Sequence, residues 1–309
     1  AARQVALITG ASSGIGEATA QRLAKEGFDL ILVARREERL NDLKIRLEKE
    51  FGGSTGLSIC TIALDITDRE AVRLAFQNSK DVKTAELLKR LTVLVSNAGL
   101  AKGVDPMPEA RVEDWETMIE TNVMGLLYVT RFALDFIKPN RGHLVNLGSV
   151  AGRWTYPGGG VYCATKAAVL AITEGLRLDL QGSGVRVTNI EPGKVSTEFS
   201  LVRYNDPERA RKEYEGYEPL SPADIADCIA WSVTRPPHVN IQELVIFPTA
   251  QASVTPLGPL PVEGAAQPGL ERPGVGVQVC HLEQRLEVVE VRPGGRPGAS
   301  ADHEGEVSA

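Results

Sequence analysis

Tyr162 and Lys166 are the two residues whose types and spacing most directly suggest chemistry. On a helix, residues i and i+4 project from one face, so the phenol and the ammonium would lie side by side. The ammonium would favour phenolate and lower the phenol pKa from about 10, as proton exchange with an alcohol at neutral pH requires. Ser149 follows an apolar run, and its hydroxyl could bond a substrate oxygen or only cap a strand. These residues predict acid–base chemistry on a hydroxyl or carbonyl group.

A glycine-rich turn, Thr9–Gly16, directly follows the first apolar run and opens the first helical pattern. Its three glycines would let the chain turn tightly against a pyrophosphate, and the helix N-terminus would supply N–H donors. The turn alone could be a plain strand-to-helix connection, but this context predicts a dinucleotide site. The expected cofactor contacts in the turn are Gly10, Ser12, Ser13, Gly14, Ile15 and Gly16.

The end of the second predicted strand bears on which dinucleotide would bind. A protein selective for NAD usually places an acidic residue there, to bind the ribose 2′-hydroxyl. This sequence instead has Ala34 followed by Arg35 and Arg36, and guanidinium groups suit the 2′-phosphate of NADP. Alternatively, one of these arginines only caps the strand or pairs with Glu37 or Glu38, which applies more to Arg36 than to Arg35.

The elements that would position these residues alternate between short β-branched apolar runs and longer helical patterns, which is typical of βαβ units and a parallel sheet. The order predicts an α/β protein with a doubly wound, seven-stranded parallel sheet (Rossmann fold), whose ligands bind beyond the carboxyl ends of the strands. Strands are expected at 5–9, 30–34, 57–63, 92–96, 143–147, 185–190 and 244–247. Helices are expected at 15–26, 37–50, 68–78, 112–137, 160–181 and 222–234.

The predicted helix 160–181 has too many apolar positions for one buried stripe, so more than one of its sides must be covered. Packing within one subunit and an oligomer interface both explain this pattern.

Composition excludes several classes of protein. Residues 251–309 hold 4 of the 34 basic and 8 of the 40 acidic residues, which leaves 30 and 32 in the first 250. Without a basic run, nucleic acid is a poor candidate partner. No apolar run is long enough to span a membrane and the start lacks a signal-peptide pattern, so we expect neither membrane insertion nor secretion. Four widely spaced cysteines indicate no disulfide framework and no metal site, and favour a cytoplasmic protein.

The composition changes after Ala250, which predicts that a catalytic domain of residues 1–250 ends there. The extension 251–309 contains 7 Pro and 9 Gly, a level typical of low-complexity, disordered or loosely attached segments. Alternating valines at 275–279 and an apolar run at 286–291 would allow a marginal hairpin.

The chain resembles the short-chain dehydrogenase/reductase family over about residues 4–248. The resemblance rests on motifs in the family's order and spacing: Thr9–Gly16, Asn97-Ala98-Gly99, Asn122, Ser149, Tyr162-x-x-x-Lys166 and Pro192-Gly193. It implies that Tyr162 is the general acid/base, that Lys166 binds the nicotinamide ribose, that Ser149 orients the carbonyl and that Asn122 holds a water for proton relay. It also implies a homotetramer and further cofactor contacts, at Asp65, Ile66, Asn97, Ala98, Gly99, Pro192, Gly193, Val195 and Thr197.

Further segments, around residues 152–159, 190–193, 197–203 and 248–251, are similar to the NADP-dependent 3-hydroxy acid dehydrogenase branch. That similarity implies hydride transfer between NADP(H) and serine, allo-threonine or another small 3-hydroxy acid, with Arg203 or Arg153 available to hold the substrate carboxylate. Surface ion pairing is the alternative for Arg203, and a structural role is favoured for Arg153. Two departures are Ser96 before Asn-Ala-Gly and Lys194 after Pro-Gly, the second of which bears on the substrate loop.

Two other functions fit the same residues less well. The protein could be a broad carbonyl reductase for neutral aldehydes and ketones, which a substrate without a carboxylate would reveal. It could instead be a non-catalytic NADP-binding regulatory protein, against which the intact Ser149, Tyr162, Lys166 and Asn122 argue.

Overall fold

The structure is a computed structural model that describes residues 3–254. Its sheet has seven strands, all parallel, in the order β3-β2-β1-β4-β5-β6-β7. This confirms the predicted doubly wound architecture. The strands are β1 (Val5–Thr9), β2 (Asp29–Ala34), β3 (Ile59–Ala63), β4 (Leu91–Ser96), β5 (His143–Leu147), β6 (Arg186–Pro192) and β7 (Glu243–Ile246).

The central strands are mostly apolar because helices cover both of their faces. Every residue of β1, β2 and β5 is buried. The register pairs Ile8 of β1 with Leu32 of β2 on one side and with Val95 of β4 on the other. The carboxyl ends of these three strands therefore meet at one edge of the sheet.

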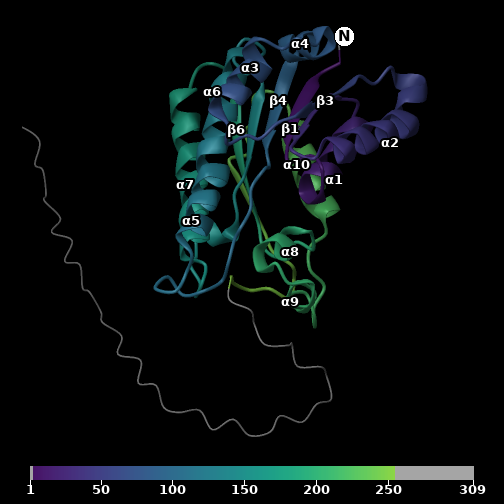
Figure 1. Cartoon of the computed structure of the whole chain (residues 1–309). Coiled ribbons are helices and arrows are strands. Elements are labelled where there is room, and N and C mark those ends of the chain that lie inside the picture. The colour runs from purple at the N-terminus through teal and green to yellow at the C-terminus, as the bar shows by residue number, and fades with distance from the viewer. Residues whose placement is uncertain (1–2, 255–309) are drawn as a thin grey trace, which may run out of the picture. The chain divides into compact units, whose positions relative to one another are not determined.

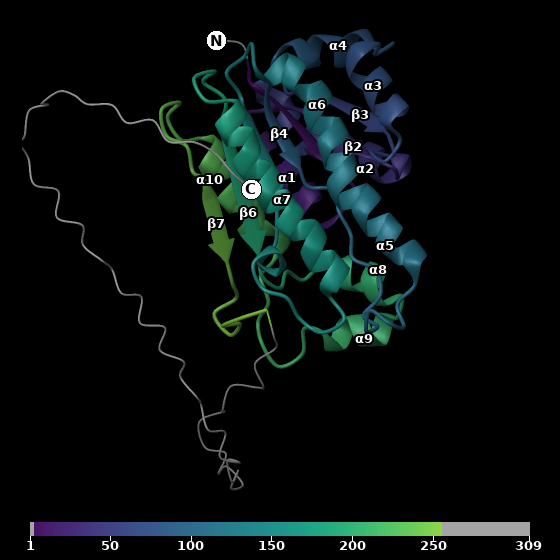
Figure 2. The same cartoon turned by 90° about the vertical axis from the view of Figure 1, so that its left-hand side faces the viewer.

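Two helical layers enclose the sheet (Figures 1 and 2). Helices α1, α2 and α10 pack on one face, where Leu23, Leu40 and Ile229 belong to one apolar cluster. Helices α3, α4, α6 and α7 cover the other face, around a cluster that includes Phe76 and Leu144. Their bounds are α1 (Gly14–Lys25), α2 (Glu37–Thr55), α3 (Arg69–Gln77), α4 (Val82–Lys89), α6 (Leu126–Ile137), α7 (Gly160–Asp179) and α10 (Pro222–Val233).

Shorter elements gather at the carboxyl edge. Helices α8 (Phe199–Tyr204) and α9 (Pro207–Lys212) follow β6, and Figure 1 shows both beyond the end of the sheet. A 3-10 turn, η2 (Val150–Gly152), follows β5, and its N-cap is Ser149. The strand order reverses between β1 and β4, so this edge is the switch point at which such sheets bind ligands.

The helices differ from the sequence prediction in several places. Helices α4, α8 and α9 were not predicted; the side chain of the α4 N-cap, Asp81, accepts a hydrogen bond from Thr84 N. Helix α2 continues through two glycines to residue 55, and Gly56 ends it in the left-handed region at φ 64°. The predicted helix 112–137 is three pieces, α5 (Val112–Ile119), the π-helix η1 (Glu120–Gly125) and α6.

The last described residues belong to the fold. Gln251 is buried, and its Oε1 accepts a hydrogen bond of 2.8 Å from Lys194 N. Contacts of the domain thus extend past the predicted boundary at 250. The possible hairpin at 275–291 and the rest of the extension from residue 255 lie outside the described residues.

Candidate active site

A cleft with a cavity volume of about 380 Å³ lies at the carboxyl edge of the sheet. The glycine-rich turn lines it together with the ends of β2, β4, β5 and β6 and the start of α8. Tyr162 and Lys166 of α7 line it as well. One cavity therefore joins the predicted dinucleotide turn to the predicted acid–base pair.

The glycine-rich turn has the conformation that its glycines predicted. Gly10 and Gly14 have φ angles of 67° and 57°, in the region that side chains disfavour. A Cβ on Gly16 would lie 2.3 Å from Gly10 O, so only glycine fits between the turn and α1. Ser13, the N-cap of α1, makes no side-chain capping bond. Open backbone N–H groups at this helix end, with its positive dipole, suit a phosphate.

Thr9 and Asn97 fix the turn against β4. Thr9 Oγ1 accepts hydrogen bonds of 3.0 Å from the N–H groups of Asn97 and Ala98. Asn97 Nδ2 donates to Thr9 O at 2.9 Å and to Gly10 O at 3.3 Å. The Asn-Ala-Gly segment thus supports the turn by direct contact, and all three of its residues line the cleft.

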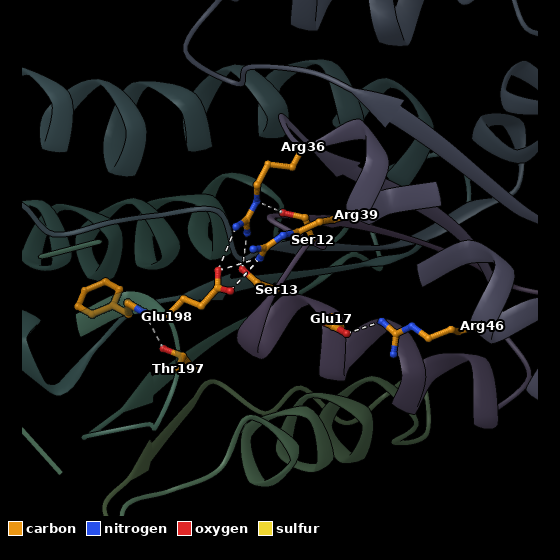
Figure 3. A network of polar contacts seen from close by, with 9 residues as sticks. Ser12, Ser13, Glu17, Arg36, Arg39, Arg46, Thr197 and Glu198 are labelled. Carbon is orange, nitrogen blue, oxygen red and sulfur yellow. Dashed lines mark hydrogen bonds and ion pairs between the residues drawn. The ribbon is translucent and has the colours of Figure 1, made fainter. Parts of the chain in front are cut away.

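The two arginines after β2 lie in different surroundings. Arg36 donates from Nε to Ser12 Oγ at 3.1 Å and from Nη2 to Ser13 Oγ at 2.6 Å (Figure 3). Arg35 is exposed, and its nearest ion-pair partner, Asp65, is 3.9 Å away. Arg36 does not pair with Glu37 or Glu38, which was one form of the alternative interpretation; its carboxylate partner is Glu198. The geometry thus favours Arg36 over Arg35 as the fork beside the turn.

The predicted acid–base residues lie together at the other end of the cleft. Tyr162 and Lys166 are 9% and 8% exposed, and Lys166 Nζ lies 6.0 Å from the centre of the Tyr162 ring. Lys166 Nζ donates to Leu147 O at 2.7 Å. Ser149 Oγ accepts from Ala151 N at 3.1 Å and donates to Pro192 O at 3.4 Å. The Ser149 hydroxyl thereby holds the η2 turn beside β6.

The pKa values correct one expectation. Burial raises the pKa of Tyr162, with a smaller rise from Tyr156, and hydrogen bonding to Ser149 only partly offsets this. Burial also lowers the pKa of Lys166 to about 8. The predicted lowering of the phenol pKa by Lys166 is not seen here, because burial dominates the pKa of Tyr162. The Tyr162 phenol therefore stays protonated at neutral pH in this arrangement.

Asn122 lies in the π-helix η1, beneath the cleft. Its Oδ1 accepts from Leu100 N and its Nδ2 donates to Leu100 O, both at 2.8 Å. Nδ2 also donates to Thr165 Oγ1 at 3.1 Å. The side chain thus ties η1 to α7 and to the segment after β4. The predicted water relay through Asn122 stays a prediction.

The structure separates the two arginines proposed for the substrate. Arg153 donates to both carboxylate oxygens of the buried Glu191, at 2.5 and 2.8 Å, and also pairs with Glu243. Those pairs raise its already high pKa, and it does not line the cleft. This geometry favours the structural interpretation of Arg153, in which it ties the turn after β5 to β6 and β7.

Arg203, on α8, lies beside the acid–base end of the cleft. Its guanidinium carbon is 5.2 Å from the centre of the Tyr156 ring and 5.6 Å from that of Tyr204. It makes no ion pair with Glu198 or Asp206, the surface partners considered from the sequence. Its positive charge reaches Tyr162, whose pKa it lowers slightly against the stronger effect of burial. A cation therefore stands near the predicted proton donor.

The remaining predicted contacts gather in the same place. Most of them line the cleft: Asp65, Ile66, Pro192, Gly193, Val195 and Thr197. Gly16, Asn122, Arg153 and Arg203 do not line it.

The sequence prediction omitted three cleft residues on the segment after β6, namely Glu198, Phe199 and Val202. Glu198 and Phe199 both line the cavity, and the Phe199 ring lies edge-on to Tyr162 at 5.6 Å between ring centres. The signal was present in the Thr197–Arg203 segment, but spacing alone does not show which of its residues face the cavity.

Ser96 and Lys194, the two departures from the family pattern, lie in different surroundings. Lys194 Nζ pairs with Glu213 at 2.8 Å and lies 5.5 Å from the centre of the Tyr217 ring. Lys194 therefore anchors the segment after α9 to the loop after β6. The Ser96 hydroxyl is buried and has no hydrogen-bond partner among the described residues.

Residues 3–254 contain no group of side chains that could hold a metal ion. Within the same range, no helix is long and apolar enough to cross a membrane. Cys60, Cys163 and Cys228 are free thiols, and Cys280 lies outside the described residues.

The known proteins that this chain resembles are dehydrogenases and reductases. The family model for short chain dehydrogenases matches residues 4–207. An NADP-dependent 3-hydroxy acid dehydrogenase of Salmonella typhi is 44% identical over 251 residues, which are 80% of this chain and 96% of that protein. A sulfoacetaldehyde reductase of Chromohalobacter salexigens is 43% identical over 80% of this chain and 95% of its own. A serine dehydrogenase in its closed form with NADP+ is 42% identical, with a TM-score of 0.73, over 82% of this chain and 98% of that chain.

Proposed function

The chain belongs to the short-chain dehydrogenase family, and from that premise we propose that it transfers hydride reversibly between NADP(H) and a small 3-hydroxy acid. One observation carries the proposal. A single cleft joins the glycine-rich turn and Arg36 to Tyr162, Lys166 and Ser149. The named relatives that act with NADP on hydroxy acids and serine support it.

The residues present fit NADP. The positive φ angles of Gly10 and Gly14, together with the uncapped N-terminus of α1, form a cradle for a pyrophosphate. Arg36, held by Ser12 and Ser13, would bind the 2′-phosphate. Bound NADP supplies the hydride chemistry, and the protein supplies position, proton transfer and electrostatics.

Tyr162 would move the proton. In the reducing direction, Tyr162 Oη donates its proton to the substrate oxygen, and the raised pKa keeps that proton on the phenol. In the oxidising direction, the same oxygen takes the hydroxyl proton. Ser149 would orient the substrate oxygen, and Lys166 would bind the nicotinamide ribose.

Arg203 would hold the acidic group of the substrate. A carboxylate removed from water needs a cation or several N–H donors, and the Arg203 guanidinium lies among the rings of Tyr156 and Tyr204 near Tyr162. Serine, 3-hydroxy acids and sulfoacetaldehyde, which the relatives' names mention, each carry an anionic group close to the reacting carbon. This shared feature supports an anion site on this chain.

We also propose that the chain forms a homotetramer. Large apolar side chains are exposed on several helices, among them Ile119 of α5 and Leu178 of α7, which are 46% and 67% exposed. Contact between copies would remove this surface from water. Light scattering coupled to size exclusion measures the mass directly: four chains are expected, and a monomer would contradict the proposal.

A spectrophotometric screen tests the activity. NADP reduction is followed with serine, allo-threonine, 3-hydroxyisobutyrate and 3-hydroxypropionate, and with neutral alcohols of similar size. Activity confined to the acids supports the proposal. Equal activity on the neutral alcohols would favour a broad carbonyl reductase, and no activity on any of them would favour a non-catalytic protein.

A further inference from the structure

A carboxylate of the protein lies between the arginines next to the glycine-rich turn. Glu198 Oε2 is 3.0 Å from Arg36 Nη1, and Glu198 Oε1 is 2.8 Å from Arg39 Nη1 (Figure 3). Arg39 Nη1 also donates to Glu198 Oε2 at 3.0 Å. The two guanidinium groups come from the start of α2, whereas Glu198 comes from the loop after β6. The contact therefore joins both sides of the cleft.

The donors of Arg36 are divided between the turn and this carboxylate. Nε and Nη2 bind Ser12 and Ser13, which leaves Nη1 for Glu198. The side chains of Arg36, Arg39 and Glu198 are 45%, 48% and 44% exposed. A half-exposed ion network of this kind contributes little to stability and can be exchanged for another anion.

Glu198 is also linked to the reacting end of the cleft. It directly precedes α8, whose first residue, Phe199, packs edge-on against Tyr162. At the far end of α8, Arg203 O accepts a hydrogen bond from Gly103 N at 3.1 Å. Helix α8 is thus held at one end by the arginines and at the other by the loop after β4.

We propose that Glu198 is an internal competitor for the 2′-phosphate of the cofactor, and that its displacement by the phosphate releases the α8 segment. The proposal rests on the NADP site proposed above. A phosphate carries more negative charge than a carboxylate, and two anions in contact with the same guanidinium groups repel each other. Glu198 therefore yields the Arg36 and Arg39 donors when a 2′-phosphate arrives.

Two effects should follow that depend on the 2′-phosphate. Removal of the Glu198 charge strengthens binding of a nucleotide that carries the 2′-phosphate and leaves a nucleotide without it unaffected. Binding of the phosphate to the native protein loosens α8, although ligands usually rigidify the sites that they occupy. The residue thus couples recognition at the adenosine end to the loop that carries Phe199 and Arg203.

Calorimetric titration with two fragments tests the first consequence. Adenosine 2′,5′-bisphosphate carries the 2′-phosphate, and 5′-AMP does not. The variants are Glu198→Gln and the matched control Glu38→Gln, which removes the same charge from an exposed α2 residue that has no ion pair with a described residue. Glu198→Gln should bind the bisphosphate about fivefold more tightly than the wild type at low salt, with the gain shrinking as salt screens the charges.

Hydrogen exchange of the α8 amides tests the second consequence without relying on activity. In the wild type, saturation with the bisphosphate should accelerate exchange in residues 199–204, and 5′-AMP should not. In Glu198→Gln the exchange should be fast already and unchanged by either fragment. Thermal unfolding of the variant confirms that the domain remains folded.

The outcomes separate this inference from the proposed function. If the wild type binds the bisphosphate no better than 5′-AMP, the NADP site itself is wrong. Two results would refute the competitor role of Glu198 and leave the NADP site intact. In the first, the wild type prefers the bisphosphate but Glu198→Gln binds it no more tightly than the wild type does. In the second, hydrogen exchange of α8 slows when the bisphosphate binds. A gain of the same size in Glu38→Gln would also overturn the competitor role, because net charge alone would then explain the effect.

Discussion

Replacing Arg203 with Met should separate charged from neutral substrates. Methionine keeps much of the apolar stem between the rings of Tyr156 and Tyr204 and removes the cation. A hydrogen bond to a charged group is worth about 1.5–3 kcal/mol, which corresponds to a rise in KM of roughly 10- to 150-fold for serine or 3-hydroxypropionate. A small neutral aldehyde uses no such contact, so its KM should change less than about threefold by the same reasoning.

Steady-state kinetics at saturating NADP(H) measures both KM values. The matched control is Arg209→Met, on α9. Both arginines lie over the ring of Tyr204, and the Arg209 guanidinium carbon is 4.8 Å from the centre of that ring. Arg209 is exposed, and its loss should leave both substrates unaffected. Equal losses on charged and neutral substrates in Arg203→Met would refute the reasoning, and would mean that Arg203 only positions α8.

Three further changes test other parts of the site. Tyr162→Phe should lower kcat by about 10²- to 10⁴-fold with NADPH affinity nearly unchanged, because the ring still packs but delivers no proton; retained turnover in a stopped-flow assay would exclude the assigned role. Arg36→Ala should raise the Kd of NADPH by roughly 10- to 100-fold, whereas Arg35→Ala should raise it by less than about threefold, since only Arg36 is held beside the turn. Fluorescence titration of both variants with NADPH, and with NADH as the reference, measures the two Kd values, and a larger loss in Arg35→Ala would contradict the assignment. Burial lowers the pKa of His143 from 6.5 to about 3, helped by the charge of Arg186. Between these two pH values the unfolded state binds more protons, so the free energy of unfolding should fall with decreasing pH by up to about 1.4 kcal/mol per pH unit. Urea unfolding of His143→Gln should show a flatter pH dependence, and an unchanged slope would assign the effect to other groups.

The sheet could be predicted from sequence because each strand carries its own signal. In β1 every side chain is buried, and the strand reads as an apolar run from Val5 to Ile8. The glycine-rich turn was equally predictable, since Gly10, Gly14 and Gly16 are required by backbone geometry within one short segment.

The helices show where local patterns end. The 112–137 segment has a helical period throughout, and the π-helix that interrupts it brings Asn122 to the backbone of Leu100. Helix α4 is only 8 residues long, too short to show a clear period. Such features depend on partners distant in the sequence.

The least predictable part of the site is the pairing between the β6 loop and α2. Glu198 and Arg39 are 159 residues apart, and each alone reads as an ordinary surface charge. The same applies to Tyr162, whose pKa depends on burial by the surrounding fold. From the sequence, the neighbouring Lys166 suggested the opposite direction.

Deuterium transfer tests the central claim most directly. 3-Hydroxypropionate deuterated at C3 is incubated with the protein and NADP+, and the nicotinamide is isolated for mass spectrometry and NMR. The account predicts reduced NADP with deuterium at C4 of the nicotinamide, and loss of this product in Tyr162→Phe. Unlabelled reduced cofactor, or labelled product formed at the same rate by Tyr162→Phe, would contradict it.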